Sequence, residues 1–425
     1  MTTPTVDKPT VHFDLSEIYF TFSKKYKYYG IARTVVEIGY ELHKLNRGVK
    51  FVIFSPAHTA FFEVQPKFGA DASNGLLEIS FPEGVNPVRL RRRFANVNPF
   101  RSALMPLARA IVWGLNRRKW ARIPQDKLRR VDMTGQILIT VGRYKVAADY
   151  LTMLGAKVKD FKFYPLLHDM IPLYFSSEDY DEILPMNFIM DNDTIIRASK
   201  GVIANSEFTA RDLQRFSDEG TLPTLPEVIT VPLVHEFRPS NEPVIKEAPK
   251  EPYALCVGTQ PGRKNLETVF TAWSQMLKQG RTPPKLVLAG AKLKVTTDCL
   301  ETDFADIIPY VIFIENPNQN ELMEHYKQAL ALIIPSRIEG WGLPLGEALW
   351  FGTPGIGAKI DALQEVGGDL ALYFDPLDVG TLVGHVVRLQ DDPEFTQTLR
   401  ARIAAAHPQL RRWSDVAEEI FDGVS

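Results

Sequence analysis

The chain has little cysteine and no long apolar stretch. Its 425 residues include two cysteines, Cys256 and Cys299, which excludes a disulfide framework and is typical of a reducing compartment. Neither cysteine has a metal-binding spacing to a histidine, so we expect no metal site. No window approaches ~18 uninterrupted apolar residues, so no membrane-spanning helix is expected. The polar start, MTTPTVDKPT, lacks the apolar core of a cleaved signal peptide, and we expect a cytoplasmic protein.

Charge is close to balanced overall but gathers in one segment. The chain is 45% hydrophobic and 24% charged with a net charge of −2, which is ordinary for a protein with two cored domains. Between residues 89 and 130, thirteen Lys and Arg stand against one acid, Asp126, a net of +12. Apolar residues interleave with this charge. They are Phe94, Phe100, Leu104, Met105, Leu107, Ile111, Val112, Trp113, Leu115 and Trp120.

This basic insertion, near residues 86–131, has three interpretations. A basic amphipathic segment can lie on an anionic membrane surface, which would place the protein peripherally on the inner face of the membrane. It can equally be a solvated insertion that packs a few apolar residues on its own domain. A polyanionic partner is the third interpretation, although we expect no nucleic acid partner.

Short apolar runs alternate with helical patterns, which predicts an α/β protein with parallel sheets. The strands expected in the first half are Val11–Asp14, Val49–Ser55, Gln136–Val141, Lys162–Leu167, Gly201–Ala204 and Glu227–Val231. Those expected in the second half are Tyr253–Val257, Lys285–Ala289, Tyr310–Ile314, Ala329–Ile334, Gly355–Gly357 and Ala371–Phe374. The expected helices are Ile31–Leu45, Ser206–Phe216, Asn265–Lys278, Asn320–Lys327, Leu345–Phe351 and Val379–Gln390.

A proline-rich stretch, Pro232–Pro252, separates the two halves and is interpreted as a linker. The predicted organisation is therefore a first domain over 1–235, a linker over 236–251, a second domain over 252–405 and a closing C-terminal helix over 406–425. In two open doubly wound sheets, a ligand is expected at the carboxyl ends of the strands, in the cleft between the domains.

The segment Ser336–Glu347, SRIEGWGLPLGE, carries the strongest chemical signal. It follows an apolar run and opens a helix, so its backbone N–H groups and the positive helix end can bind an anion such as a diphosphate. Two carboxylates, Glu339 and Glu347, flank the Gly-rich turn and can accept hydrogen bonds from sugar hydroxyls. The segment therefore predicts a nucleotide-sugar site. The simpler alternatives are an exposed loop acid at Glu339 and a charge that favours the helix dipole at Glu347.

A second loop, Gly258–Asn265, reads GTQPGRKN and also lies between a predicted strand and a predicted helix. Its glycines allow close backbone approach, and its Arg263 and Lys264 can neutralise a diphosphate. A solvated turn before a helix is the alternative.

Taken together, these segments resemble a known family. EGWGLPLGE, with VGTQPGRKNLETVFTAW before it and EVGGDLALYFDP after it, resembles the donor half of glycosyltransferase family 4. The resemblance is strong over 253–376 and weaker in the first half, through YYGIART, LLHDMIP and VIANSEFTARDL. It implies a GT-B fold, in which two Rossmann-like domains face each other across a cleft, and transfer with retention of configuration. The helix that contains Trp413 resembles the family's closing segment.

The resemblance implies a role for individual residues of the second half. Glu339 would contact the donor sugar near the reacting carbon, and Glu347 would hold the ribose of the nucleotide. Arg263 and Lys264 match the family's diphosphate-binding pair. The backbone N–H groups of Gly342 and Leu343 would meet phosphate oxygens.

Two residues of the first half also receive roles from the resemblance. His168, in LLHDMIP, matches the histidine that touches the transferred sugar. Its neighbour Asp169 either orients the imidazole or caps the next turn. Gly30 stands where the family has a Gly-rich loop under the diphosphate, but here YYG has one glycine where many members have two.

The function implied is hexose transfer, with mannose from GDP-mannose preferred because LLHDMIP is similar to segments of bacterial mannosyltransferases of surface-polysaccharide synthesis. The implied acceptor is a glycan or a lipid-linked molecule. No cofactor or metal is expected, since the cationic side chains neutralise the phosphates. Two alternatives stay open: a sugar-nucleotide epimerase, and a non-catalytic nucleotide-sugar-binding regulator or subunit of the same fold.

Asp191-Asn192-Asp193 has the acid-x-acid form used by metal-dependent transferases of another fold. Because Thr194-Ile195-Ile196-Arg197 follows, we interpret the acids as charges and caps at the start of a helix.

Overall fold

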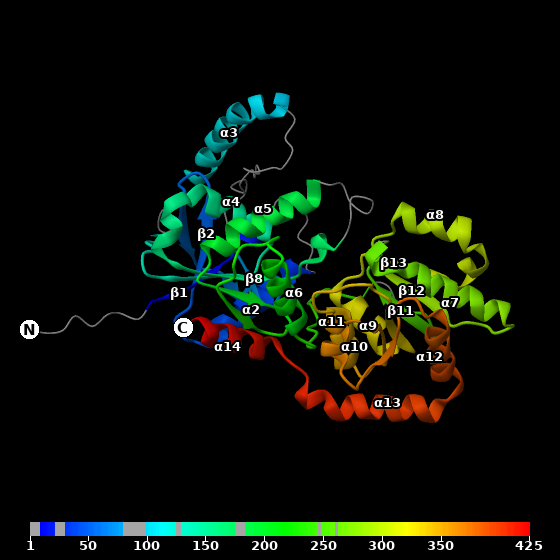
Figure 1. The fold of residues 1–425 in the computed structure, drawn as a ribbon. Coiled ribbons are helices and arrows are strands. Elements are labelled where there is room, and N and C mark those ends of the chain that lie inside the picture. The colour runs from blue at the N-terminus through cyan, green and yellow to red at the C-terminus, as the bar shows by residue number, and fades with distance from the viewer. Residues whose placement is uncertain are drawn as a thin grey trace, which may run out of the picture. The chain divides into compact units, whose positions relative to one another are not determined.

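A computed structural model describes residues 9–21, 30–79, 99–124, 129–174, 183–244, 248–259 and 262–425. The chain divides into two compact units. The first unit comprises Met1–Asn205, Thr209–Val231 and Trp413–Ser425, and the second comprises Ser206–Phe208 and Pro232–Arg412. Figure 1 shows both with the chain coloured from the N-terminus in blue to the C-terminus in red.

The first unit is built on a mixed sheet with the strand order β10-β9-β8-β7-β1-β2-β3-β6 in its described part. The strands from β10 to β2 pair in parallel, and β3 and β6 add antiparallel pairs at one edge. Their bounds are β1 Val11–Asp14, β2 Lys50–Ser55, β3 Ala60–Val64, β6 Arg129–Arg130, β7 Ile137–Thr140, β8 Lys162–Leu167, β9 Gly201–Ala204 and β10 Glu227–Thr230. The short strands β4 (Lys67–Phe68) and β5 (Leu77–Glu78) pair with each other.

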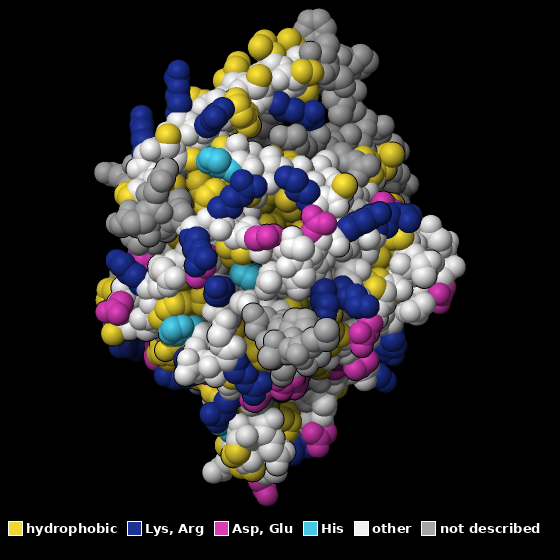
Figure 2. All heavy atoms as spheres, turned by 90° about the vertical axis from the view of Figure 1, so that its left-hand side faces the viewer, with side chains coloured by type: hydrophobic (Ala, Val, Ile, Leu, Met, Phe, Trp, Pro, Cys, Tyr) yellow, Lys and Arg dark blue, Asp and Glu magenta, His cyan; other side chains and the backbone are white. Residues whose placement is uncertain are grey.

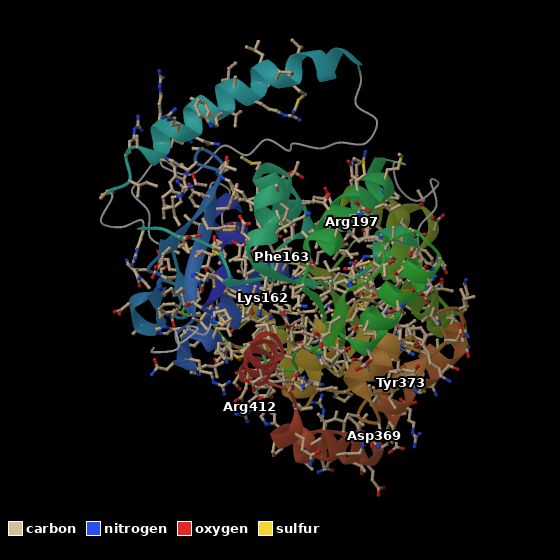
Figure 3. All side chains as sticks on the ribbon, turned by 60° about the vertical axis from the view of Figure 1, so that its left-hand side comes forward. Lys162, Phe163, Arg197, Asp369, Tyr373 and Arg412 are labelled. Carbon is tan, nitrogen blue, oxygen red and sulfur yellow. The ribbon has the colours of Figure 1, made fainter. Side chains whose placement is uncertain are left out.

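Successive side chains of these strands enter opposite layers of the unit. Lys162 is exposed at the start of β8, while the ring of its neighbour Phe163 is fully buried in the core (Figure 3). The described helices are α1 Ser16–Thr21, α2 Ile31–Lys44, α3 Pro99–Trp120, α4 Tyr144–Leu154, α5 Ile183–Ala198, α6 Glu207–Asp218 and α14 Trp413–Val424.

The C-terminal helix α14 packs on α2 of the first unit, although it comes after the whole of the second unit in the sequence (Figure 1). Trp413 is fully buried, and the guanidinium of Arg33 lies 5.8 Å from the centre of its ring. At the other end, Arg47 forms ion pairs with Glu418 and Asp422. The helix in the predicted closing segment 406–425 therefore begins at Trp413.

The second unit has a fully parallel sheet with the order β13-β12-β11-β14-β15-β16. Its strands are β11 Tyr253–Val257, β12 Lys285–Gly290, β13 Val311–Glu315, β14 Ala331–Ile334, β15 Gly355–Ala358 and β16 Leu372–Phe374. Its helices are α7 Leu266–Lys278, α8 Lys294–Asp303, α9 Gln319–Gln328, α10 Leu343–Trp350, α11 Asp361–Gly367, α12 Val379–Asp391 and α13 Pro393–Ala406.

The strand order of the second unit indicates where a ligand is expected to bind. From β11 the chain proceeds outward to β12 and β13, then returns to β14 on the other side of β11 and continues to β15 and β16. The order therefore reverses between β11 and β14, and open parallel sheets bind their ligands at such a switch point, outside the carboxyl ends of the strands. The predicted α/β class with doubly wound parallel sheets is confirmed.

Two details differ from what the sequence suggested. Phe237, at the start of the stretch predicted as a linker, is buried against Tyr326 and Phe351 and belongs to the second unit. The interpretation of residues 191–193 as a helix start was wrong, because they lie well inside α5. There Asp193 pairs with Arg197 one turn later at 2.8 Å, which is an ordinary ion pair along a helix.

Candidate functional site

The site is built from two loops that follow the neighbouring strands β11 and β14. The backbone N–H of Arg337 donates to the carbonyl of Arg263 at 2.8 Å, so the two loops are joined directly. Asn265 strengthens the junction, because its side-chain amide donates to the carbonyls of Pro335 and Pro376, both at 3.1 Å. Asn265 adopts a left-handed conformation with φ 53°, which asparagine tolerates better than most residues.

Glu339 brings both cationic side chains of the first loop together. Lys264 Nζ donates to Glu339 Oε1 at 2.7 Å, and Arg263 Nη1 donates to Glu339 Oε2 at 3.1 Å. Burial would by itself raise the pKa of Glu339, but the charges of Lys264 and Arg263 outweigh it and lower that pKa to about 2. The cluster is therefore a carboxylate held between two cations, and all three side chains keep some exposure to solvent.

The Gly-rich turn follows Glu339 in the sequence and leads directly into helix α10. Gly342 is the N-cap of α10 and has φ 112°, a conformation that favours glycine. A Cβ at this position would also lie 2.4 Å from Leu363 Cδ2. Leu343 begins the helix and Pro344 follows, which is a favoured place for proline. The first N–H groups of a helix lack acceptors within the helix, so this end can receive an anion.

Glu347 lies further along α10 and is almost fully buried. The hydroxyl of Tyr326 donates to Glu347 Oε2 at 2.6 Å, and the carbonyl of Tyr326 accepts from Thr353 Oγ1 at 2.7 Å. Glu347 is thus a positioned carboxylate beyond the first turn of α10, which argues against the alternative of a charge that favours the helix dipole. The sequence contained no signal for Tyr326, because α9 and α10 are separate elements whose packing determines the contact.

His168 lies in the first unit, directly after the carboxyl end of β8. Its Nε2 lies 2.9 Å from the carbonyl oxygen of Val141, which follows the neighbouring strand β7, so that nitrogen carries a proton and donates. Burial lowers the pKa of His168 to about 4, although the bond to Val141 opposes the shift. The imidazole is therefore neutral at pH 7. Asp169 accepts from the backbone N–H of Ile171 at 3.0 Å, which supports the capping role.

Gly30 is the N-cap of α2, also in the first unit. Its φ of 61° lies in the left-handed region, and its carbonyl accepts from the N–H of Thr34 at 3.2 Å. The preceding residues of the YYG loop lie outside the described residues. Of the predicted site residues, the second unit brings Arg263, Lys264 and Glu339 together and holds Gly342, Leu343 and Glu347 on the adjoining turn and helix, while His168 and Gly30 belong to the first unit.

A cavity of about 760 Å³ in the first unit lies at the opposite sheet edge from His168. Its lining includes Gly135, Lys162, Arg197 and Lys200, which stand at or before the amino ends of β7, β8 and β9 (Figure 3 labels Lys162 and Arg197). It is therefore separate from the predicted site. Within the described ranges, no group of three or more His, Cys, Asp and Glu side chains is placed to hold a metal ion.

Comparison with known proteins places both loops of the site within a known protein family. Residues 237–406 match the family described as "Glycosyl transferases group 1". The second unit carries a glycosyl transferases group 1 domain. This stretch contains both loops of the site, so the domain's match covers Arg263, Lys264, Glu339 and Glu347.

Among curated proteins, the chain is similar to the O-antigen chain mannosyltransferase B of Escherichia coli, with 31% identity over 161 residues. That match covers 37% of this chain and 42% of the relative. The serotype-specific mannosyltransferase WbdA of Escherichia coli matches over 365 residues at 23% identity, which is 82% of this chain and 44% of WbdA. The chain thus matches less than half the length of each of these relatives.

Among solved structures, the sucrose-phosphate synthase of Thermosynechococcus elongatus superposes with a TM-score of 0.62 at 17% identity and covers 97% of this chain and 98% of that one. HepE from Anabaena, solved with UDP and glucose, gives a TM-score of 0.55 at 15% identity, with coverages of 98% and 99%. At this identity the likeness concerns the fold, and it confirms the GT-B fold class.

Proposed function

We propose that this chain is a retaining glycosyltransferase of family 4 that transfers mannose from GDP-mannose to a glycan or a lipid-linked acceptor. The observation that carries the proposal is the Arg263–Glu339–Lys264 cluster at the switch point of a parallel sheet. A pair of cations beside a helix N-terminus suits a diphosphate, and carboxylates within the same site suit sugar hydroxyls.

The reaction requires the leaving group to be stabilised more than it requires a strong nucleophile. The bond between the anomeric carbon and the β-phosphate oxygen breaks, and the acceptor hydroxyl oxygen forms the new bond to the same carbon. In the front-face displacement that we favour, the proton of that hydroxyl passes to the leaving phosphate oxygen. Arg263, Lys264 and the N–H groups of Gly342 and Leu343 would stabilise the charge on the leaving diphosphate.

The two glutamates would take different parts of the donor. Glu339 is charged and placed between the cations, so it can accept from sugar hydroxyls near the reacting carbon while it orients Lys264 and Arg263. Glu347 is fixed by Tyr326 and would accept from the ribose hydroxyls. His168, which is neutral, would make a hydrogen bond to the transferred sugar from the first unit and not act as a cation.

The choice of mannose rests on relatives and on one motif. The curated names of two matching proteins are mannosyltransferases, one of them of O-antigen chains, and LLHDMIP is similar to segments of that class. We extend the proposal to an acceptor of the surface-glycan kind, handled at the cytoplasmic face of the membrane. The cations at the site would neutralise the diphosphate, so we propose that turnover needs no added metal or cofactor.

The experiment is a panel of nucleotide sugars, scored first by thermal stabilisation and then by release of nucleoside diphosphate. GDP-mannose should raise the melting temperature most, since a tight ligand stabilises the folded state by mass action, and it should be slowly hydrolysed. Stabilisation by another nucleotide sugar in place of GDP-mannose would overturn the donor. Binding with no release, with or without acceptor glycans, would point to the non-catalytic alternative.

A pair of variants links this result to the site. Arg263→Ala with Lys264→Ala should weaken the affinity for the nucleoside diphosphate in calorimetry by about 100-fold, which is ~2.7 kcal/mol. Lys278→Ala with Arg281→Ala removes the same two charge types from exposed positions of the same unit and should leave the affinity unchanged. An unaltered dissociation constant in the first pair would remove Arg263 and Lys264 from the site.

A further inference from the structure

Helix α3 carries apolar side chains on two sides, and one side is exposed. The side chains described for this helix are those of residues 104–120. The inner side is formed by Met105, Val112, Asn116 and Trp120, of which the last two are buried. The ring of Trp120 packs near the rings of Tyr19, His58 and Phe62 of the first unit.

The outer side is a second apolar stripe, which consists of Leu104, Leu107, Ile111 and Leu115. These residues are three and four positions apart, so they share one face of the helix, over a length of about 16 Å. Leu107 is 63% exposed, Ile111 is 57% exposed and Leu104 is 53% exposed. The inner side already anchors the helix to its unit, so the outer stripe has no role in that packing.

Basic residues flank the exposed stripe, and acids are absent from it. No Asp or Glu occurs in the sequence from residue 84 to residue 125. At the C-terminal end of α3, Arg117, Arg118 and Arg122 are exposed. Figure 1 shows α3 extending from the sheet of the first unit, and Figure 2 shows hydrophobic side chains with some Lys or Arg side chains among them where α3 lies. The Arg cluster at 89–93 lies outside the described residues.

We propose that the outer face of α3 docks on an anionic lipid bilayer. Exposed leucine and isoleucine side chains suit the boundary between headgroups and acyl chains, and arginines beside them suit anionic headgroups. The helix lies on the bilayer and does not cross it, because among the described helices none has the length and hydropathy to span a membrane. The packing of Trp120 on Tyr19, His58 and Phe62 supports the second interpretation for the inner side of α3. The membrane interpretation is the one that we propose for the outer side.

Two observations favour a bilayer over a second copy of the chain. A copy that packs through the same face would bring a second basic segment without Asp or Glu at residues 84–125 against this one, and like charges at a shared interface repel. A bilayer of anionic lipids supplies opposite charge along with an apolar layer. The docking does not depend on the proposed transfer reaction, because it can be measured without donor or acceptor.

The experiment is sedimentation of the full chain with vesicles of phosphatidylglycerol and phosphatidylcholine, compared with vesicles of phosphatidylcholine alone. The chain should pellet with the anionic vesicles only, and less so as salt is raised. Leu107→Glu with Ile111→Glu should reduce the bound fraction at least about tenfold, while the variant keeps the melting temperature because both side chains are exposed. Arg117→Gln with Arg118→Gln should reduce binding and flatten its dependence on salt.

The matched control is Val295→Glu with Leu377→Glu, which adds the same charge at two exposed apolar residues of the second unit. This control should pellet like the unaltered chain. A chain that stays in the supernatant with anionic vesicles at low salt overturns the proposal. So does pelleting that is insensitive to Leu107→Glu with Ile111→Glu, which would assign binding to charge elsewhere. A dimer in light scattering that this pair dissolves, with no vesicle binding, would instead assign the stripe to a second copy.

Discussion

Lys264 donates to Glu339 across 2.7 Å, and the same carboxylate takes a second hydrogen bond from Arg263. The three side chains neutralise each other only in part, so the cluster keeps one positive charge. A diphosphate that enters therefore meets cations already fixed by Glu339, and it need not order two long side chains by itself. Such preorganisation is what makes a charged group effective at a reacting centre.

Replacing Glu339 by Gln should separate catalysis from binding. The amide keeps the shape but can accept from only one of Lys264 and Arg263, so it removes part of their preorganisation and also the anion that competes with a diphosphate. These two changes oppose each other, so the affinity for nucleoside diphosphate should change far less than turnover. Turnover should fall by roughly 100-fold or more, on the scale seen when one preorganised group is removed from an active site. Calorimetry and steady-state kinetics measure the two effects. The exposed Glu301→Gln is the control, and equal turnover in both variants would refute the role of Glu339.

Tyr326→Phe tests whether the position of Glu347 matters for donor binding. The variant leaves one buried carboxylate oxygen without its 2.6 Å hydrogen bond, so KM for the donor should rise about tenfold, or ~1.4 kcal/mol. Tyr253→Phe is the control, since that buried hydroxyl donates to the carbonyl of His325 in the same unit. Tyr253→Phe should lose about 1 kcal/mol of stability, and Tyr326→Phe about 1.5–3 kcal/mol because its hydroxyl bonds a carboxylate. A KM that rises equally in both would reduce Tyr326 to a structural role.

Much of the parallel framework could be predicted from the sequence, because fully buried strands are short apolar runs with clear ends. The bounds of β8 and β11 were predicted to the residue. The antiparallel strand β3 was missed, since AFFEV has no separate pattern beyond its pairing with β2. Helix α3 was seen only as a basic segment with apolar residues, because apolar side chains on two sides blur the helical period.

The candidate site residues were singled out from the sequence, but their contacts were not. Glycine spacing and the strand-turn-helix context singled out Glu339 and Arg263 in separate loops. Their ion pair depends on β11 and β14 being neighbours, which is a property of strand order. Likewise, the interpretation of residues 191–193 failed because a local pattern of acids resembles a cap even within a longer helix.

Gly342→Ala should damage the end of α10 at which we propose that the diphosphate binds. Alanine at φ 112° is strained, and its Cβ would lie 2.4 Å from Leu363 Cδ2, so the buried Leu363 side chain or the turn must shift. Gly352→Ala is the matched control, because Gly352 also has a positive φ of 73° but open space around its Cβ. The control should cost about 1–2 kcal/mol of stability from backbone strain alone. Gly342→Ala should cost more and also weaken nucleoside diphosphate binding, as denaturation and calorimetry would show. Equal losses of stability in both variants, with unchanged affinity, would contradict the proposed diphosphate binding at the start of α10.

The neutral state of His168 predicts how acid weakens the fold. In the unfolded chain a histidine binds a proton below about pH 6.5, whereas the folded His168 has a pKa of about 4. Between these values unfolding takes up a proton, so the free energy of unfolding falls as the pH falls from 6.5 to 4. Above pH 6.5 the neutral imidazole has no such effect, and the stability that acid removes is fully retained. His168→Gln keeps an N–H for the carbonyl of Val141 but cannot titrate. Denaturant unfolding at a series of pH values should therefore give a shallower acid loss in the variant than in the unaltered chain. Parallel curves would mean that His168 binds its proton at the same pH in the folded and the unfolded chain, which would contradict a lowered pKa and a neutral imidazole between pH 6.5 and pH 4.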